Sequence, residues 1–333
     1  NELLNGIDRN NTSNKKNFKK LKKINFTDNY QNLENCNFLI VTVPTPIKSN
    51  KTPNLKYINQ ACKVISMILK KNDIVVFEST VYPGLTEEYC VPILEKNSNL
   101  KHTKDFYVGY SPERINPGDK TRNIRNITKI ISGCNKKTRE IINRIYKKII
   151  DVDTYVVSSI KVAESAKVIE NTQRDLNIAL INELTIIFNK LNIDTREVVE
   201  AAGTKWNFQK FYPGLVGGHC IGVDPYYIAD KSISMGYKPE IILSGRKLND
   251  SMGTFIADEV IGLLNDCKGN LNKLKVLVLG ITFKENCPDY RNTKVVDLVS
   301  KLKDNFLEVD IFDPWVDKSS FYNEHSLNVF HKI

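Results

Sequence analysis

Three short apolar runs, each followed at once by polar or proline-rich residues, constrain the fold of this chain most. They occupy residues 37–43, 73–78 and 106–110. Such β-rich runs suit strands that are buried on both faces of a parallel sheet. A helix-like stretch at 55–69 separates the first two. Strands that alternate with helices predict a doubly wound α/β domain, in which ligands bind beyond the carboxyl ends of the strands.

The residues directly after these runs are therefore candidate ligand-binding residues. They are Pro44-Thr45-Pro46, Ser79-Thr80 and Ser111-Pro112-Glu113-Arg114. Because the carboxyl ends of parallel strands lie at one edge of a sheet, we expect the three segments to lie near one another.

A second β-loop-α-β unit closes the chain. It contains strands at 275–280 and 308–312, a loop at 281–291 and a helix at about 294–302. Only Gly280 stands in the turn after the first strand, so the three-glycine dinucleotide fingerprint is not met.

Charged residues in this second unit leave two alternatives open. Asp313 ends the second strand, where it imitates a ribose-binding acid but also forms a common Asp-Pro turn. Lys284 and Arg291 either hold a pyrophosphate or are merely exposed basic residues.

Between the two β-containing regions the pattern is helical, with segments at 160–191, 194–202 and 240–261. We therefore predict two Rossmann-like doubly wound α/β domains joined by a central helical region. The predicted boundaries are 1–155, 156–262 and 263–333.

One face of the long helix carries Glu164, Lys167, Asn171 and Arg174, at spacings of three, four and three. A solvated polar stripe with weak ion pairs is one interpretation. The apolar residues around the stripe favour the other, in which an amide and an ammonium face a pocket.

A glycine-rich loop contains the most informative cysteine. The run from Phe211 to Pro225 has four glycines, two prolines and the pair Cys220 and Asp224. Glycines allow positive φ and close approach to a ligand, and prolines stiffen the backbone between them. Cys220 is therefore a candidate nucleophile, whereas most free cysteines are small buried hydrophobes.

Composition narrows the class of protein. With 333 residues, of which 41% are hydrophobic, the chain suits a soluble protein with two or three domains. Seven scattered cysteines without a C-x-x-C pair indicate reduced thiols and a cytoplasmic location, and neither they nor the four histidines show metal-ligand spacing. A net charge of +10 suits an anionic partner, either a phosphorylated small molecule or nucleic acid. Because the lysines are spread evenly along the chain, the interpretation as a nucleic-acid-binding protein is the weaker one. No apolar run is long enough to span a membrane.

Six motifs occur in a series that resembles the nucleotide-sugar 6-dehydrogenases of the UDP-glucose/GDP-mannose dehydrogenase family. They are Val43-Pro44-Thr45-Pro46, residues 78–84, residues 111–119, Ala163–Lys167 with Asn171, the loop at Cys220, and Gly280-x-x-Phe283-Lys284 through Asp289-x-Arg291. Their order matches the family over nearly the whole chain. The Lys205–Phe208 and Pro213–Cys220 runs most resemble the branch that oxidises UDP-N-acetylhexosamines, especially UDP-N-acetylglucosamine, for bacterial surface polysaccharides.

The resemblance implies a two-step oxidation of the sugar C6 alcohol, with hydride passing to NAD each time and Cys220 holding a thiohemiacetal and then a thioester. Lys167 and Asp224, with a water between them, would manage the alcohol proton and stabilise the oxyanion. Asn171 would donate to the same oxygen and Thr80 would position the reacting water. Glu113 would assist thioester hydrolysis, and Pro117 stands where some relatives have a second glutamate, so a two-glutamate scheme is not expected.

The resemblance also implies binding residues and partners. Expected contacts to NAD involve Pro44, Thr45, Ser79, Thr80 and Arg291. Expected contacts to the UDP-N-acetylhexosamine involve Lys167, Asn171, Phe211, Gly217, Gly218 and Lys284. We expect a homodimer or larger homo-oligomer paired through the central helix, with no metal, nucleic-acid or membrane partner.

The dinucleotide fingerprint itself is absent from the sequence. Asn1–Gly6 reads as the last turn of a helix with a glycine cap, and in the family the G-x-G-x-x-G turn lies upstream of this point. We therefore expect an incomplete N-terminal domain, a C-terminal domain that is cut short, and weak NAD binding by these residues alone. A non-catalytic relic of the family is the alternative to an active dehydrogenase.

Overall fold

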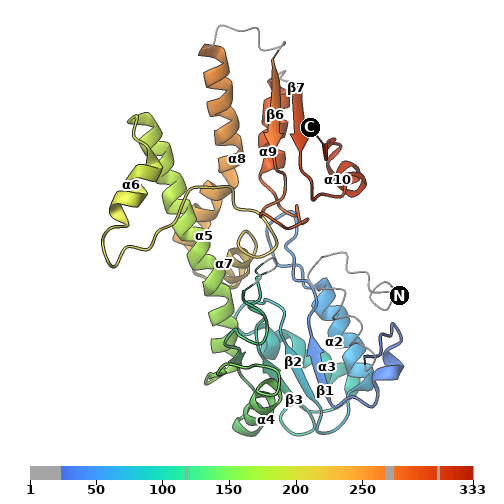
Figure 1. Ribbon diagram of the computed structural model, residues 1–333. Coiled ribbons are helices and arrows are strands. Elements are labelled where there is room, and N and C mark those ends of the chain that lie inside the picture. Colours follow the sequence, from blue (N-terminus) through green and yellow to red (C-terminus); the bar gives the residue numbers. More distant parts are fainter. Residues whose placement is uncertain (1–23, 117–118, 120, 267–273, 306–307, 333) are drawn as a thin grey trace. The chain divides into compact units, whose positions relative to one another are not determined.

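The computed structural model describes residues 24–116, 119, 121–266, 274–305 and 308–332 (Figure 1). Its elements in chain order are η2 (Tyr30–Leu33), β1 (Phe38–Val41), α2 (Lys56–Ile68), β2 (Ile74–Phe77), η3 (Thr86–Cys90), α3 (Val91–Ser98), β3 (Tyr107–Tyr110), β4 (Ile130–Ile131), α4 (Lys136–Tyr146), β5 (Tyr155–Val156), α5 (Ile160–Lys190), α6 (Thr195–Ala202), α7 (Asp224–Ser234), α8 (Glu240–Asp266), β6 (Lys275–Leu279), α9 (Val295–Asp304), β7 (Glu308–Phe312) and α10 (Lys318–His325).

The chain forms two compact units. The first comprises Asn1–Glu170 and Tyr226–Met235, and the second comprises Asn171–Pro225 and Gly236–Ile333. The boundary falls within α5, and the predicted division into three domains stays a prediction. The predicted helix end at Asn1–Gly6 lies outside the described residues.

A three-stranded parallel sheet of order β1-β2-β3 forms the centre of the first unit. Its register pairs Val41 with Phe77 and Phe77 with Tyr110. All four residues of β2 are buried, as expected for a strand covered on both faces. The three predicted strands are therefore confirmed, each shorter than its apolar run.

The two faces of this sheet contribute to different hydrophobic cores, because successive strand residues point to opposite sides. Val75 and Phe77 of β2 join the core that contains residues of α2 and α3. Ile74 and Val76 join the core that contains Ile142 and Tyr146 of α4. Helices on both faces confirm the doubly wound α/β class.

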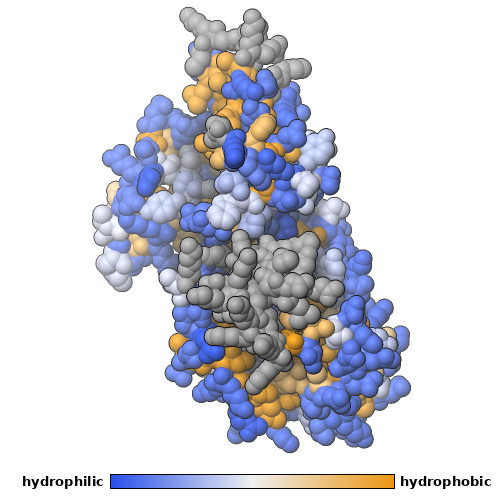
Figure 2. Space-filling view, turned by 45° about the vertical axis from the view of Figure 1, so that its right-hand side comes forward, coloured by the Kyte–Doolittle hydropathy of each residue, from blue (hydrophilic) through white to orange (hydrophobic). Residues whose placement is uncertain are grey.

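The second unit contains a parallel pair of strands, β6 and β7, in which Leu279 is opposite Phe312. Helix α8 packs closely on α9, and a Cβ on Gly253 would lie 2.5 Å from the carbonyl oxygen of Lys294. Leu277 and Leu279 are 48% and 68% exposed, so one face of β6 is uncovered among the described residues. Figure 2 shows hydrophobic side chains at the surface in this part of the molecule.

The predicted helices at 55–69, 160–191, 194–202 and 240–261 are all present, and the last extends to Asp266. Helices α3, α4, α7 and α10 and the two-residue strands β4 and β5 were not predicted. Within the described ranges, no helix has the length and apolar character that crossing a bilayer requires.

Candidate functional site

The carboxyl edge of the first unit's sheet carries the predicted cofactor residues. Ser79 Oγ donates a hydrogen bond of 2.6 Å to the carbonyl oxygen of Val43, so this side chain ties the loops after β1 and β2 together. Thr45 and Thr80 are half-buried and Pro44 is exposed. The structure thus brings these four residues to one edge of a parallel sheet, where doubly wound folds bind nucleotides.

Glu113, with a side chain that is 40% exposed, lies at the edge of a charge cluster that the sequence did not indicate. Lys129, with a side chain only 4% exposed, lies 3.2 Å from Glu78 Oε1 and 3.5 Å from Glu113 Oε2. Tyr146 donates its hydroxyl to Glu78, and its ring lies 5.3 Å from the Lys129 ammonium. Glu113 Oε1 accepts the backbone N–H of Arg114 at 2.6 Å. The ammonium and the backbone therefore hold the Glu113 carboxylate in one orientation.

Three members of the polar stripe on α5 are buried and one is not. Glu164, Lys167 and Asn171 are 0%, 9% and 6% exposed, whereas Arg174 is exposed. The interpretation as a solvated stripe is therefore wrong for the first three. Lys167 stands one helical turn before Asn171, so the two side chains leave the helix on the same face.

Glu164 anchors the segment after the second strand. Its carboxylate accepts the backbone N–H groups of Gly84 at 2.5 Å and Thr86 at 2.9 Å. Burial raises the pKa of this carboxyl to about 7, although the two hydrogen bonds oppose the shift. This side chain fixes the start of η3, a few residues beyond Ser79 and Thr80.

In the second unit, Cys220 and Asp224 share one turn. The Cys220 carbonyl accepts the backbone N–H of Asp224 at 2.8 Å, and this turn leads into α7. Asp224 is 2% exposed, and its Oδ2 accepts a hydrogen bond of 2.6 Å from the amide of Asn171. The structure therefore joins Asn171 with Asp224 and places the half-buried Cys220 one turn away.

Buried polar groups hold the glycine-rich loop in place. The Asn182 side chain accepts from the Gly214 N–H at 2.9 Å and donates to the Gly214 carbonyl at 3.0 Å. Asn182 also donates to Asn249, which donates to Asp175 at 2.8 Å. Arg246 completes the cluster with a 2.5 Å ion pair to Asp175. Helices α5 and α8 thus position the loop through hydrogen bonds.

The loop also packs against the segment after β6. Gly218 has φ +81, and a Cβ there would lie 2.8 Å from the Phe283 ring. Its N–H donates to the Arg291 carbonyl at 2.9 Å. A Cβ on Gly217 would lie 2.9 Å from Phe283. Both positions therefore require glycine, while Phe211 is half-buried at the start of the loop.

His219, beside Cys220, is a site residue that the sequence interpretation missed. Its Nδ1 lies 3.3 Å from Asp289 Oδ2 and 3.0 Å from a terminal nitrogen of Arg291. Arg291 also donates to both oxygens of Asp289, so its side chain is engaged within this cluster. Its position next to the candidate nucleophile is the one sequence feature that could have identified His219. Its partner Asp289 belongs to a loop that is distant in the sequence.

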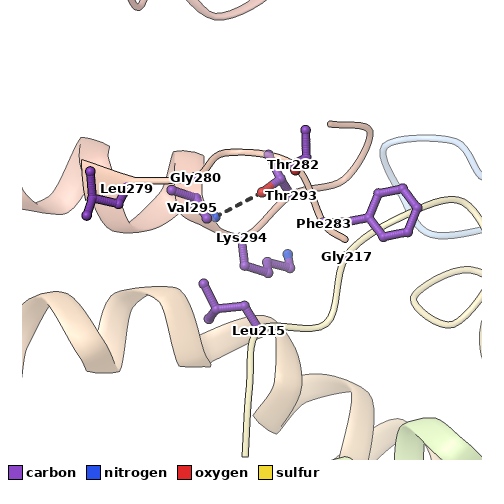
Figure 3. A pocket seen from close by; sticks show the side chains of 9 residues that line it. All are labelled: Leu215, Gly217, Leu279, Gly280, Thr282, Phe283, Thr293, Lys294 and Val295. Carbon is purple, nitrogen blue, oxygen red and sulfur yellow. Dashed lines mark hydrogen bonds between the residues drawn. The ribbon is translucent and has the colours of Figure 1, made fainter. Parts of the chain in front are cut away.

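A pocket of about 260 Å³ opens at the carboxyl end of β6 (Figure 3). Gly217, Gly280, Phe283 and the start of α9 line it, and the side chains of Leu215 and Lys294 point toward it. Positive φ at Gly280 makes this turn compact. The pocket has the position of a nucleotide phosphate site in a Rossmann-like unit.

Asp313 closes the base of this turn. One carboxylate oxygen accepts the N–H groups of Ile281 and Thr282, and the other accepts those of Trp315 and Val316. Asp313 is 2% exposed. Of the two alternatives, the turn is therefore the one observed. Lys284 lies on the same loop, where its carbonyl accepts a 3.1 Å hydrogen bond from Thr282.

No cluster of three or more potential metal ligands occurs among the residues with described positions.

The comparisons with known proteins identify all three regions of the chain. Models of the UDP-glucose/GDP-mannose dehydrogenase family match as its NAD binding domain at residues 11–150, its central domain at 161–251 and its UDP binding domain at 277–333. The chain is 54% identical over 326 residues to the UDP-N-acetyl-D-glucosamine 6-dehydrogenases of Pseudomonas aeruginosa and Salmonella typhi, covering 98% of this chain and 77% of each relative.

A solved structure is also similar to this chain over most of its length. The UDP-D-ManNAc dehydrogenase of Pyrococcus horikoshii superposes with a TM-score of 0.84 at 29% identity, covering 91% of this chain and 71% of that one. The NAD binding domain is present. The residues at its sheet edge fit a dinucleotide because the half-buried Thr45 and Thr80 offer hydroxyls where such cofactors bind. The chain therefore belongs to the UDP-glucose/GDP-mannose dehydrogenase family.

Proposed function

We propose that this protein oxidises the C6 hydroxyl of a UDP-N-acetylhexosamine, namely UDP-N-acetylglucosamine, to the carboxylate with transfer of four electrons to two NAD molecules. The geometry of Cys220, Asp224 and Asn171 carries the proposal, because it joins a thiol with a buried amide–carboxylate pair. The 54% identity to two UDP-N-acetyl-D-glucosamine 6-dehydrogenases supports the choice of sugar.

Cys220 is the proposed covalent residue. A thiolate adds to the aldehyde that the first oxidation produces, and the resulting thiohemiacetal still carries the hydrogen that leaves as hydride in the second oxidation. The thioester formed in this way is hydrolysed to the acid. NAD, when bound, accepts the hydride in each oxidation.

Asn171 and Asp224 act together on the reacting oxygen. The Asn171 amide already donates to Asp224, and its second N–H can donate to an oxyanion. The buried Asp224 accepts the proton of an alcohol directly or through a water. Lys167, one turn earlier on α5, supplies a cation that stabilises the same oxyanion.

Two residues of the first unit are proposed to act on the water that hydrolyses the thioester. Glu113 accepts a proton from the water that attacks the thioester, since Lys129 and the backbone hold its carboxylate in place. Thr80, half-buried at the end of β2, positions that water. Roles for Pro44, Thr45 and Ser79 in holding NAD follow from their place at the sheet edge.

The UDP binding domain supplies the nucleotide contacts. The pocket at the end of β6 is smaller than most drug-sized ligand pockets, so it would hold a pyrophosphate or a single ring. Lys284 is proposed to contact the UDP-sugar from the same loop, while Gly217, Gly218 and Phe211 shape the loop that encloses the sugar. Arg291 is proposed to reach the phosphates of the cofactor.

Steady-state NADH absorbance with the purified protein tests the proposal. UDP-N-acetylglucosamine should give two NADH per sugar, and UDP-glucose should react more slowly. Cys220→Ser should abolish turnover while UDP-sugar binding by calorimetry persists. A variant that still releases two NADH would remove the covalent role of Cys220.

UDP-N-acetylmannosamine is the second candidate substrate, because the Pyrococcus horikoshii structure is a UDP-D-ManNAc dehydrogenase. A higher kcat/KM with UDP-N-acetylmannosamine than with UDP-N-acetylglucosamine would select it. We also propose a homodimer or larger homo-oligomer and a cytoplasmic location. The expected reduced state of scattered cysteines without a C-x-x-C pair supports this location.

A further inference from the structure

The segment that follows β3 folds back on the carboxylate of Glu113. Glu113 Oε1 accepts the backbone N–H groups of Arg114 at 2.6 Å and of Ile115 at 2.7 Å. Because hydrogen bonds are directional, a change in this backbone also turns the carboxylate. The orientation of the proposed base for thioester hydrolysis therefore depends on what holds the backbone at Arg114.

The Arg114 guanidinium connects this backbone with two other parts of the first unit. One terminal nitrogen lies 2.7 Å from Glu170 Oε1 on α5. The other donates a hydrogen bond of 2.9 Å to the carbonyl oxygen of Thr128. The Arg114 and Glu170 side chains are 30% and 29% exposed, so water reaches the ion pair only in part. Arg114 thus joins three segments that are distant in the sequence.

Both ends of this connection lie beside residues that the proposed chemistry uses. Glu170 is three residues after Lys167 on α5, a spacing at which helical side chains are neighbours. Thr128 directly precedes Lys129, whose ammonium lies 3.5 Å from Glu113 Oε2. The guanidinium therefore fixes the segment of Glu113 both to the helix that carries Lys167 and to the segment that carries the cation beside the carboxylate.

We propose that Arg114 and Glu170 are positioning residues for hydrolysis of the thioester, because their ion pair fixes the Glu113 carboxylate relative to α5. This inference rests on the proposed role of Glu113 as the base. Its side chain is 40% exposed, so water can reach the carboxylate.

The hydrolysis that this positioning serves begins with one water molecule. Its O–H bond breaks and the proton moves to Glu113, while the water oxygen forms a C–O bond to the acyl carbon. The C–S bond then breaks with its electron pair on the Cys220 sulfur, which releases the acid. Glu113 passes its proton to water and is ready for the next turnover.

A purely structural ion pair would behave differently. Partly exposed ion pairs contribute little to the stability of a protein, so removal of this one should hardly change unfolding. A displacement of about 1 Å at a reacting group, by contrast, costs up to about 100-fold in rate. A positioning role therefore predicts that one chemical step slows while the fold stays stable.

Hydrogen exchange of the Arg114 and Ile115 amides tests the connection without substrate or NAD. Both amides donate to Glu113 Oε1, so their protection reports the orientation of the carboxylate. We expect both to exchange about fivefold faster in Glu170→Gln. Arg125→Gln removes another exposed ion pair of the same unit and is the matched control, in which the two amides should be unchanged. Wild-type exchange in Glu170→Gln would overturn the proposal.

Rapid kinetics separate the two oxidations from the hydrolysis. With UDP-N-acetylglucosamine and NAD, the wild type and Glu170→Gln should release two NADH per subunit equally fast in the first turnover. In later turnovers kcat of the variant should be about tenfold lower, whereas kcat/KM should be unchanged because hydrolysis follows the oxidations. Denaturing mass spectrometry should then find the acyl group on Cys220. A variant that loses kcat and kcat/KM equally and accumulates no thioester would contradict the positioning role.

A double variant shows whether the two residues act as one pair. Arg114→Gln should slow hydrolysis at least as much as Glu170→Gln, since it also loses the contact with Thr128. The double variant should be no slower than Arg114→Gln, because both changes remove the same ion pair. Losses that multiply in the double variant would mean that the residues act separately and would overturn the inference.

The proposed function and this inference fail in distinguishable ways. If the wild type releases no NADH from UDP-sugars, the dehydrogenase function fails, and amide exchange still decides whether Glu170 holds the segment of Glu113. If the wild type releases two NADH per sugar but Glu170→Gln accumulates no thioester, the function stands and the inference fails.

Discussion

The Glu164 carboxylate should make the stability of the first unit depend on pH near neutrality. It is completely buried and accepts the N–H groups of Gly84 and Thr86. Burial outweighs these hydrogen bonds and raises its pKa from the ordinary 4.5 to about 7. Folding therefore favours the protonated form, since the unfolded chain exposes the same group to water.

The sign of the effect follows from this raised pKa. The contribution of Glu164 to stability is fully present below pH 4.5 and is lost as the pH rises through about 7. At about 1.4 kcal/mol for each pH unit, the full contribution is about 3 kcal/mol. About 2.5 kcal/mol of this is lost between pH 5 and pH 8.

Glu164→Gln removes this titration and keeps the size of the side chain. Urea denaturation followed by circular dichroism gives the free energy of unfolding at pH 5 and pH 8. The free energy of the wild type minus that of the variant should fall by about 2.5 kcal/mol between the two pH values, because other titrating groups such as His219 cancel. Glu183→Gln, at an exposed position of the same helix, is the matched control and should show no such change.

A constant difference between wild type and Glu164→Gln at the two pH values would refute this reasoning. It would mean that the hydrogen bonds from Gly84 and Thr86 fully compensate the burial of the charge. Hydrogen exchange locates the effect, because the amide of Thr86 should exchange faster in the variant than in the wild type.

Two further substitutions test the buried polar groups. Asn182→Ala removes both hydrogen bonds to Gly214 and one to Asn249; we expect a loss of about 2 kcal/mol in unfolding free energy and faster hydrogen exchange in the loop. Unchanged exchange would show that the loop does not need these bonds. Lys129→Met leaves Glu78 and Glu113 without their shared cation and should lose about 3 kcal/mol in urea denaturation, with Lys129→Arg as the charge-preserving control. Equal stability of Lys129→Met and Lys129→Arg would contradict a role for the charge.

The sequence predicted the strands of the first unit well because their apolar runs are contiguous and end at turn residues. It did not predict β4 and β5, since two residues are too few to show a period. Helix α4 was missed although its N-cap signal is present, with Asn135 accepting from the Thr138 N–H at 2.8 Å. Local patterns thus specify elements where they are long or strongly apolar.

The candidate site was predictable only in part. Cys220 and Asp224 lie close together in sequence, and their spacing survives as one turn. The sequence left open whether the polar stripe on α5 is solvated. The structure shows that Glu164, Lys167 and Asn171 are buried, and this burial arises from tertiary packing that the sequence pattern does not reveal. No periodicity connects distant side chains, so the sequence alone could not pair loop residues with their partners.

The glycine-rich loop shows why this limit matters for the chemistry. It has no regular backbone ladder, so its position depends on the hydrogen bonds of Asn182 and on the fit of Gly217 and Gly218 against Phe283. Polar contacts are directional, whereas apolar packing tolerates sliding. A thiol that must meet a reacting carbon within a few tenths of an ångström therefore gains from being fixed by amides. It follows that substitutions at Asn182 should impair Cys220 chemistry more than their effect on stability indicates.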